Sequence, residues 1–186
     1  MYFFGFMAML AFNIVPTQMP FYMKTQGVGT SAGVGLLLAI LPVSSAIAGR
    51  FYASVSKHIG MWTLFLVAGV IMLSGFYSLA WLPGSADIEI SLALIGTGCG
   101  LAMPHVSLVM VRLVPQGARG RVMGTMTSCK FLGQFCSPIL LQPILMHSGY
   151  LTMLRVSGWM MLASAILVFG VGTMQRDAQE HNRETQ

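Results

Sequence analysis

Six long apolar runs, separated by short polar breaks, constrain this chain more than any other feature of its sequence. The runs cover about residues 1–23, 31–54, 61–82, 88–112, 121–145 and 150–174. A helix needs about 20 apolar residues to cross the hydrocarbon core of a bilayer, and each run reaches that length. A transmembrane barrel would need short strands of alternating polarity instead. The pattern predicts an all-α, polytopic membrane bundle of six transmembrane helices over 1–174, followed by a polar tail over 175–186.

Composition excludes most other classes of protein. Only 8% of the 186 residues are charged and 55% are hydrophobic, whereas a soluble domain carries about 25% charged residues. Disordered chains are polar, so disorder is excluded as well. The net charge of +5 is spread along the chain without a basic patch, which argues against a nucleic-acid partner. The three cysteines lie inside apolar runs without metal-ligand spacing, and no paired carboxylates suit catalysis, so we expect no metal, no cofactor and no enzymatic activity.

The basic residues predict the orientation of the bundle. The loops and the tail that should share one side of the membrane hold seven Lys or Arg residues. The loops on the other side hold one basic residue, Lys24, and two acidic residues, Asp87 and Glu89. The positive-inside rule places the basic side in the cytoplasm, and six spans then put both termini there. The seven are Arg50, Lys57, Arg112, Arg119, Arg121, Arg176 and Arg183.

Several stretches carry a family resemblance. The segments Gly96–His105, Val114–Gly124 and Phe131–Pro138 resemble the tenth and eleventh helices of major facilitator superfamily transporters, in particular the bacterial drug and sugar efflux type. The opening segment, Tyr2–Pro20, is similar to the seventh helix of that family. The resemblance implies a C-terminal six-helix half of a twelve-helix fold. It also implies secondary active efflux of a small solute across a bacterial plasma (inner) membrane, with lipid and an N-terminal six-helix half as partners.

The resemblance assigns the cytoplasmic gate to loops that carry Arg50, Lys57, Arg119 and Arg121. The first of these loops, Gly49–Gly60, departs from the family pattern because it contains no Asp. Since transporters of this kind place the solute between two halves, a chain of this length leaves three alternatives open. It is a fragment or truncated gene product, a half-transporter that pairs with a second copy, or a non-transporting membrane interaction protein or inactive remnant.

Lys130 is the charged residue predicted to lie deepest in the membrane. It stands about ten residues into the fifth run, near the middle of a ~30 Å core. A cation there costs at least ~2.5–3.5 kcal/mol against lipid, so it should face the bundle interior or a wet cavity. Thr127, Gln134 and Ser137 fall on the same helical face. The face is interpreted as a solute path in which Lys130 contacts an anion or a carboxylate; the alternative is a structural bridge to another part of the protein.

Other polar residues in the runs have two interpretations each. His105 follows Pro104 and could take part in proton coupling, or could bond a carbonyl that the proline frees. Asn13 and Thr17 lie beside Pro16, where they could contact solute or satisfy carbonyls. No Asp or Glu lies deeper in a run than Glu89 at the start of 88–112, so a carboxylate proton relay is not expected within these helices.

Overall fold

The computed structural model describes residues 1–25, 31–81 and 85–184, and it contains helices and short turns over those ranges. Lipid offers no hydrogen-bond partner, so apolar runs of this length must satisfy their backbone groups internally, which a helix does. Five helices are long and apolar enough to cross a membrane. They are α1 (Tyr2–Thr25), α2 (Ser31–His58), α3 (Thr63–Trp81), α4 (Ser85–Leu113) and α5 (Arg119–Glu184), with a short 3-10 turn, η1 (Gln116–Ala118), before α5.

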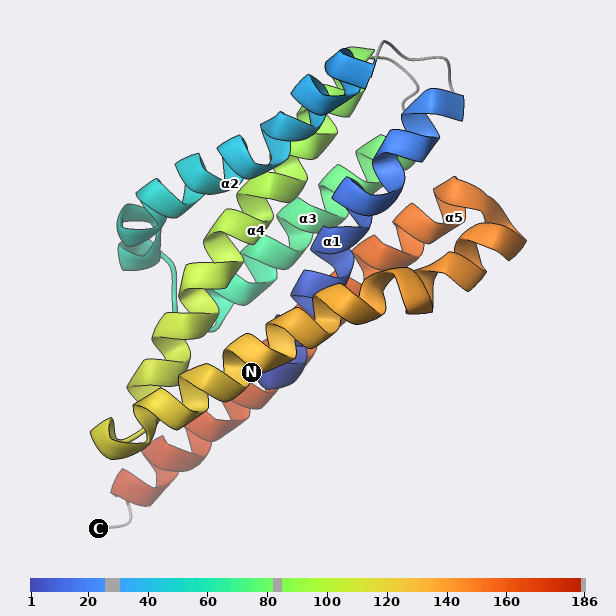
Figure 1. Cartoon of the computed structure of the whole chain (residues 1–186). Coiled ribbons are helices and arrows are strands. Elements are labelled where there is room, and N and C mark those ends of the chain that lie inside the picture. Colours follow the sequence, from blue (N-terminus) through green and yellow to red (C-terminus); the bar gives the residue numbers. More distant parts are fainter. Residues whose placement is uncertain (26–30, 82–84, 185–186) are drawn as a thin grey trace.

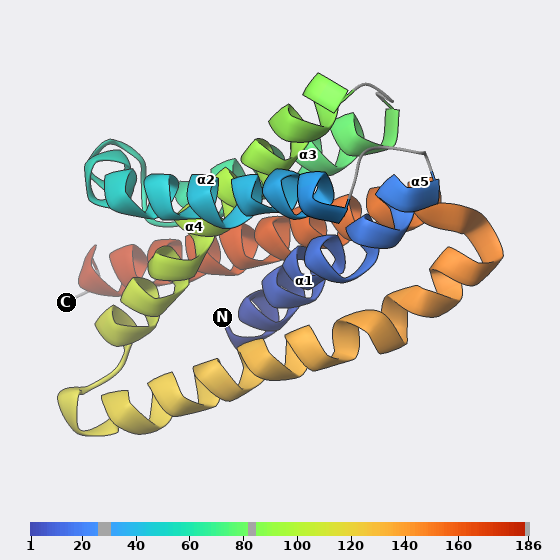
Figure 2. The same cartoon turned by 45° about the horizontal axis from the view of Figure 1, so that its top comes forward.

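The helix α5 accounts for the difference between five helices and the six that the sequence predicts. Its backbone leaves the helical region at Gly149, where φ is 78° and ψ is 175°. That combination is open almost only to glycine, since other residues carry a Cβ that collides with the backbone. The chain reverses direction there, and the two arms of α5 run back along the bundle as a hairpin (Figures 1 and 2). The expected spans 121–145 and 150–174 correspond to these two arms, and the backbone stays helical through the expected tail as far as Glu184.

The helices pack in a definite neighbourhood. α1 packs along the first arm of α5, α2 packs along α4, and α3 packs against both α4 and α5. Large buried side chains of α1 and α3 fill the centre, including Phe4, Phe65 and Phe76. The first arm of α5 and the helix α2 lie on the outside of this core and keep much of their surface uncovered. These two helices are therefore the natural places for a further partner to contact the bundle.

Small residues on α4 allow α2 to approach closely. A Cβ on Gly96 would collide with the Leu41 carbonyl oxygen, and a Cβ on Gly100 would collide with the Ser45 carbonyl oxygen. Membrane helices use such residues to bring their backbones together. Gly96 and Gly100 therefore form a helix-contact seam between α4 and α2.

Candidate functional site

Lys130 lies on the first arm of α5, beside α4 and α1. It stands 11 residues beyond Arg119, which begins the helix, and a rise of ~1.5 Å per residue puts it about 16 Å along. Its Nζ donates to the Ser107 hydroxyl at 3.3 Å. The Ser107 hydroxyl in turn donates to the Met103 carbonyl at 3.1 Å, which leaves its oxygen to accept from the lysine. Among the described residues, no carboxylate forms an ion pair with Lys130.

The two carboxylates whose side chains the structure describes lie at the end of α4 that is remote from Lys130. Asp87 and Glu89 are in the first turns of this helix, and Ser107 is 18 residues beyond Glu89. At ~1.5 Å per residue the separation along the helix is about 27 Å. Among the described residues, the half-buried Lys130 therefore has the neutral Ser107 hydroxyl as its hydrogen-bond partner, and the buried Cys99 thiol is close enough to interact with it electrostatically.

The predicted polar face of α5 divides into two parts. Ser137 is fully buried and donates to the Leu10 carbonyl of α1 at 2.8 Å, so it belongs to the helix contact. Thr127 and Gln134 are exposed on the outer side of the arm, and the Thr127 hydroxyl is bonded within its own helix to the Met123 carbonyl. Lys130 lies at the border between the two parts. The structure thus keeps Thr127, Lys130 and Gln134 together on an accessible stripe and removes Ser137 from it.

Asn13 reaches across from α1 to a proline-disturbed part of α5. Its Nδ2 donates to the Gln134 carbonyl at 3.1 Å. Pro138 is four residues later and has no N–H, so this carbonyl lacks its normal helical donor. The sequence offers the interpretation that Asn13 satisfies a carbonyl around the prolines of its helix. The carbonyl that Asn13 bonds belongs to α5, where Pro138 leaves it without a donor. Gln18 adds a second link, since its Nε2 donates to Gln142 Oε1 at 2.7 Å.

Thr17 serves the backbone of its own helix. Its hydroxyl lies 2.8 Å from the Asn13 carbonyl oxygen and 3.2 Å from the Ile14 carbonyl oxygen. Both carbonyls lie near Pro16, but the carbonyl that Pro16 leaves without a donor is that of Phe12, four residues earlier. The Thr17 hydroxyl is thus engaged within its own helix, on carbonyls other than the one that the proline frees.

His105 is buried between α2, α4 and the turn that joins α2 to α3. Its Nε2 lies 2.6 Å from the Met61 carbonyl oxygen, and its Nδ1 lies 2.8 Å from the Tyr52 hydroxyl. A carbonyl can only accept, so Nε2 donates and Nδ1 of the neutral ring accepts from Tyr52. The Phe65 ring covers His105 at a centroid distance of 4.5 Å. Among the described residues His105 shares no hydrogen bond with Lys130, and its carbonyl partner is that of Met61 rather than one freed by Pro104.

The residues predicted for the gate loops lie at one end of the bundle. Arg50 and Lys57 are exposed on the last turns of α2, and Arg119 and Arg121 are on the first turn of α5. The Arg119 Nε donates to the Val114 carbonyl at 3.4 Å, which ties the η1 turn to α5. Figure 1 shows the end of α2 and the start of α5 at the same end of the molecule. The side chains of Arg176 and Arg183 lie outside the described residues.

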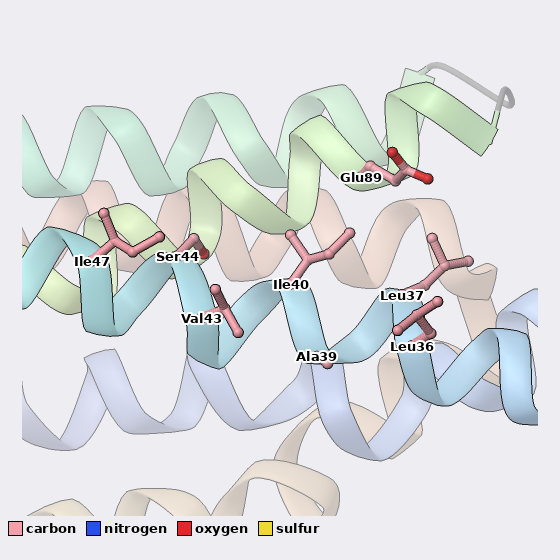
Figure 3. Close-up of a pocket in the computed structure, with 8 residues that line it drawn as sticks. All are labelled: Leu36, Leu37, Ala39, Ile40, Val43, Ser44, Ile47 and Glu89. Atoms are coloured by element: carbon pink, nitrogen blue, oxygen red, sulfur yellow. The ribbon is translucent and has the colours of Figure 1, made fainter.

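A groove of about 470 Å³ runs along the outer side of α2 (Figure 3). Aliphatic side chains form most of its wall, and Glu89 of α4 adds a carboxylate. The lining residues are Leu36, Leu37, Ala39, Ile40, Val43, Ser44, Ile47 and Glu89. None of the residues predicted for the solute path contributes to this groove.

Sequence reasoning missed Ser107, Tyr52 and Gln142, which are the partners of Lys130, His105 and Gln18. Each is a polar residue inside an apolar run, so a search for polar residues at matching depth could have named Ser107. Their pairing depends on which helices are neighbours, and that information is not in the local sequence.

Comparison with known proteins places this arrangement in a wider group. Residues 1–138 match the family model described as Major Facilitator Superfamily. The chain is 28% identical to the multidrug efflux pump Tap of Mycolicibacterium fortuitum over 137 residues, which is 73% of this chain and 34% of that protein. It is 27% identical to the uncharacterized transporter YebQ of Escherichia coli strain K12 over 134 residues, covering 70% of this chain and 29% of that one.

A solved structure has the same fold. It is a crystal structure of the peptide transporter POT in complex with alafosfalin, which aligns with a TM-score of 0.74 and 21% sequence identity. The alignment covers 91% of this chain and 36% of that transporter. The chain therefore spans about a third of the length of the relatives it matches. With the family model covering most of its residues, this multi-pass membrane protein belongs to the Major Facilitator Superfamily.

Proposed function

We propose that the chain is the C-terminal six-helix half of a secondary active transporter that exports a small solute. In this proposal α1 to α4 and the two arms of α5 make six crossings, with both termini in the cytoplasm of a bacterial cell. An N-terminal half, or a second copy of the chain, covers the exposed surfaces of α2 and α5. The similarity to a multidrug efflux pump supports export as the direction of transport.

The single observation that carries the proposal is the stripe of Thr127, Lys130 and Gln134 on the first arm of α5, about 16 Å from the start of that arm. A lysine so far from either membrane surface is costly against lipid. Water, solute or a second helical body must therefore lie against it. Transporters with paired halves place their solute at that depth and between the halves, which is where this stripe would lie.

Transport assays with Lys130→Met test the proposal. The gene product that carries this chain is expressed in a bacterial strain without its own efflux pumps, and the cellular accumulation of small aromatic solutes of both charges is measured. Cells with the wild-type protein should accumulate less of at least one solute than vector-only cells. Lys130→Met should abolish that difference at equal membrane abundance.

Lys24→Met is the matched control, because Lys24 is exposed at the last turn of α1 and outside the stripe. It should export as the wild type does. If Lys130→Met exports normally, Lys130 has no place in the path. If no solute is exported by the wild type alone or with a candidate N-terminal half, the transporter proposal itself is wrong.

A further inference from the structure

We infer that the stripe on α5 binds an amphipathic organic anion, in which an aromatic or aliphatic body carries one carboxylate, sulfonate or phosphate group. The inference rests on the proposed function, because it names the solute class for the same face. Its starting point is the charge of Lys130. Glu89 and Asp87 are remote from it along α4, and Ser107 offers only a neutral oxygen. A cation at this depth with only neutral partners has an uncompensated charge, which a bound anion would balance.

The geometry leaves room for that anion. Lys130 is half-buried, and Gln134 and Thr127 on the same side of the helix are exposed. An ammonium has three donors and Ser107 takes one, so two remain for the oxygens of an anionic group. Gln134 can supply a further N–H from its side-chain amide, because its contact with Asn13 uses only the backbone carbonyl.

Two phenylalanines define the rest of the ligand. Phe131 and Phe135 are 65% and 69% exposed on the same arm of α5. Viewed down the helix axis at about 100° per residue, Lys130 and its neighbours Gln134, Thr127 and Phe131 lie within about a third of the circumference. Phe135 is one turn beyond Phe131. The cation and its polar neighbours therefore border an aromatic surface. A small inorganic anion would leave that surface unused, whereas an aromatic anion contacts both parts.

Binding of two permanently charged naphthalene probes tests the inference. The chain is placed in phosphatidylcholine nanodiscs, and the fluorescence anisotropy of naphthalenesulfonate and of naphthylmethyl-trimethylammonium is titrated against discs without protein. The sulfonate should bind more tightly than the ammonium probe. Lys130→Met should weaken sulfonate binding by at least about tenfold, because a charge-assisted hydrogen bond is lost, and should leave the ammonium probe unaffected.

Further variants keep the result interpretable. Lys130→Arg retains the charge, so it should keep sulfonate binding within about threefold of the wild type and guards against a folding defect in the methionine variant. The double substitution Phe131→Ala with Phe135→Ala should weaken binding of the sulfonate probe by about tenfold or more, because the contact between the naphthalene and the two phenylalanine rings is lost. Lys24→Met should bind both probes as the wild type does.

Several results would overturn the inference. These are equal binding of both probes, unchanged sulfonate binding by Lys130→Met, or no sulfonate binding by the wild type. Discs that contain phosphatidylglycerol separate solute from lipid: sulfonate binding should persist there, and its loss would identify lipid phosphate as the occupant instead. Export of cations alone in the transport assay would keep the proposed function and reject the anion.

Discussion

At the scale of single residues, a polar side chain of one helix satisfies the backbone of another where a proline interrupts it. The Asn13 amide bonds the Gln134 carbonyl that Pro138 leaves without a donor. The Thr17 hydroxyl bonds carbonyls near Pro16 in its own helix, and neither is the Phe12 carbonyl that Pro16 frees. In lipid an unsatisfied carbonyl cannot bond water, so the Asn13 amide stabilises a helix that Pro138 would otherwise weaken.

The pairing of Asn13 with Pro138 leads to a test by double substitution. Asn13→Leu should lower the free energy of unfolding by about 0.6–2 kcal/mol, the usual range for a hydrogen bond between membrane helices. Pro138→Ala restores a backbone N–H for the Gln134 carbonyl, so Asn13→Leu should cost close to nothing in that background. Unfolding of the micelle-embedded protein by sodium dodecyl sulfate gives the four free energies. An equal cost in both backgrounds would show that Asn13 does not serve this carbonyl.

At the scale of helices, α5 depends on a single residue for its reversal. Gly149 takes a backbone conformation that a Cβ excludes, and no other described residue has a positive φ. The second arm then packs on α3, while the first arm packs on α1 (Figure 2).

Gly149→Ala should therefore destabilise the fold by about 1–3 kcal/mol, the cost of a strained backbone. Gly170→Ala is a matched control, because that glycine is inside the second arm and has open space where a Cβ would be. Its helix propensity should rise, so stability should stay equal or increase by up to about 1 kcal/mol. Thermal unfolding in detergent compares the two variants. A similar change for both would contradict a special role for Gly149.

At the scale of the whole molecule, the two ends of the bundle differ in charge. One end has the last turns of α2 and α4 and the start of α5, with Arg50, Lys57, Arg112, Arg119 and Arg121. The opposite end has Lys24 at the end of α1, and Asp87 and Glu89 at the start of α4. The positive-inside rule predicts that the basic end faces the cytoplasm.

Cysteine labelling tests that orientation and the count of six crossings. In a cysteine-free background, single cysteines replace Gly117 in η1, Ser148 beside the hairpin and Met174 near the end of the second arm, all three being exposed. A membrane-impermeant maleimide applied to intact cells should label the cysteine at 148 only. The other two should react after the membrane is permeabilised. Labelling of position 174 in intact cells would contradict the sixth crossing, and labelling of position 117 would contradict the orientation.

The sequence predicted most of the helices because length and hydropathy decide what can exist in lipid. The expected depth of Lys130 comes from counting along its run, and it stays a prediction. The hydrogen-bond partners could not be predicted in this way. His105 bonds the Met61 carbonyl and Asn13 bonds the Gln134 carbonyl, and backbone carbonyls look alike at every position of a sequence. Only the placement of helices shows which carbonyls are within reach. Ser137 illustrates the same limit, since its share of the polar face is taken by α1.

Because α1 packs on α5, it reaches its final contacts only after α5 has been synthesised. About 94 residues separate the end of α1 at Thr25 from the start of α5 at Arg119. At a translation rate of about 5–20 residues per second, α1 waits about 5–20 s in the membrane before its neighbour emerges. During that interval the amides of Asn13 and Gln18 lack the α5 groups that they bond in the finished protein. We therefore expect the bundle to be more open to a membrane protease before Gln142 has been synthesised than after α1 and α5 have paired.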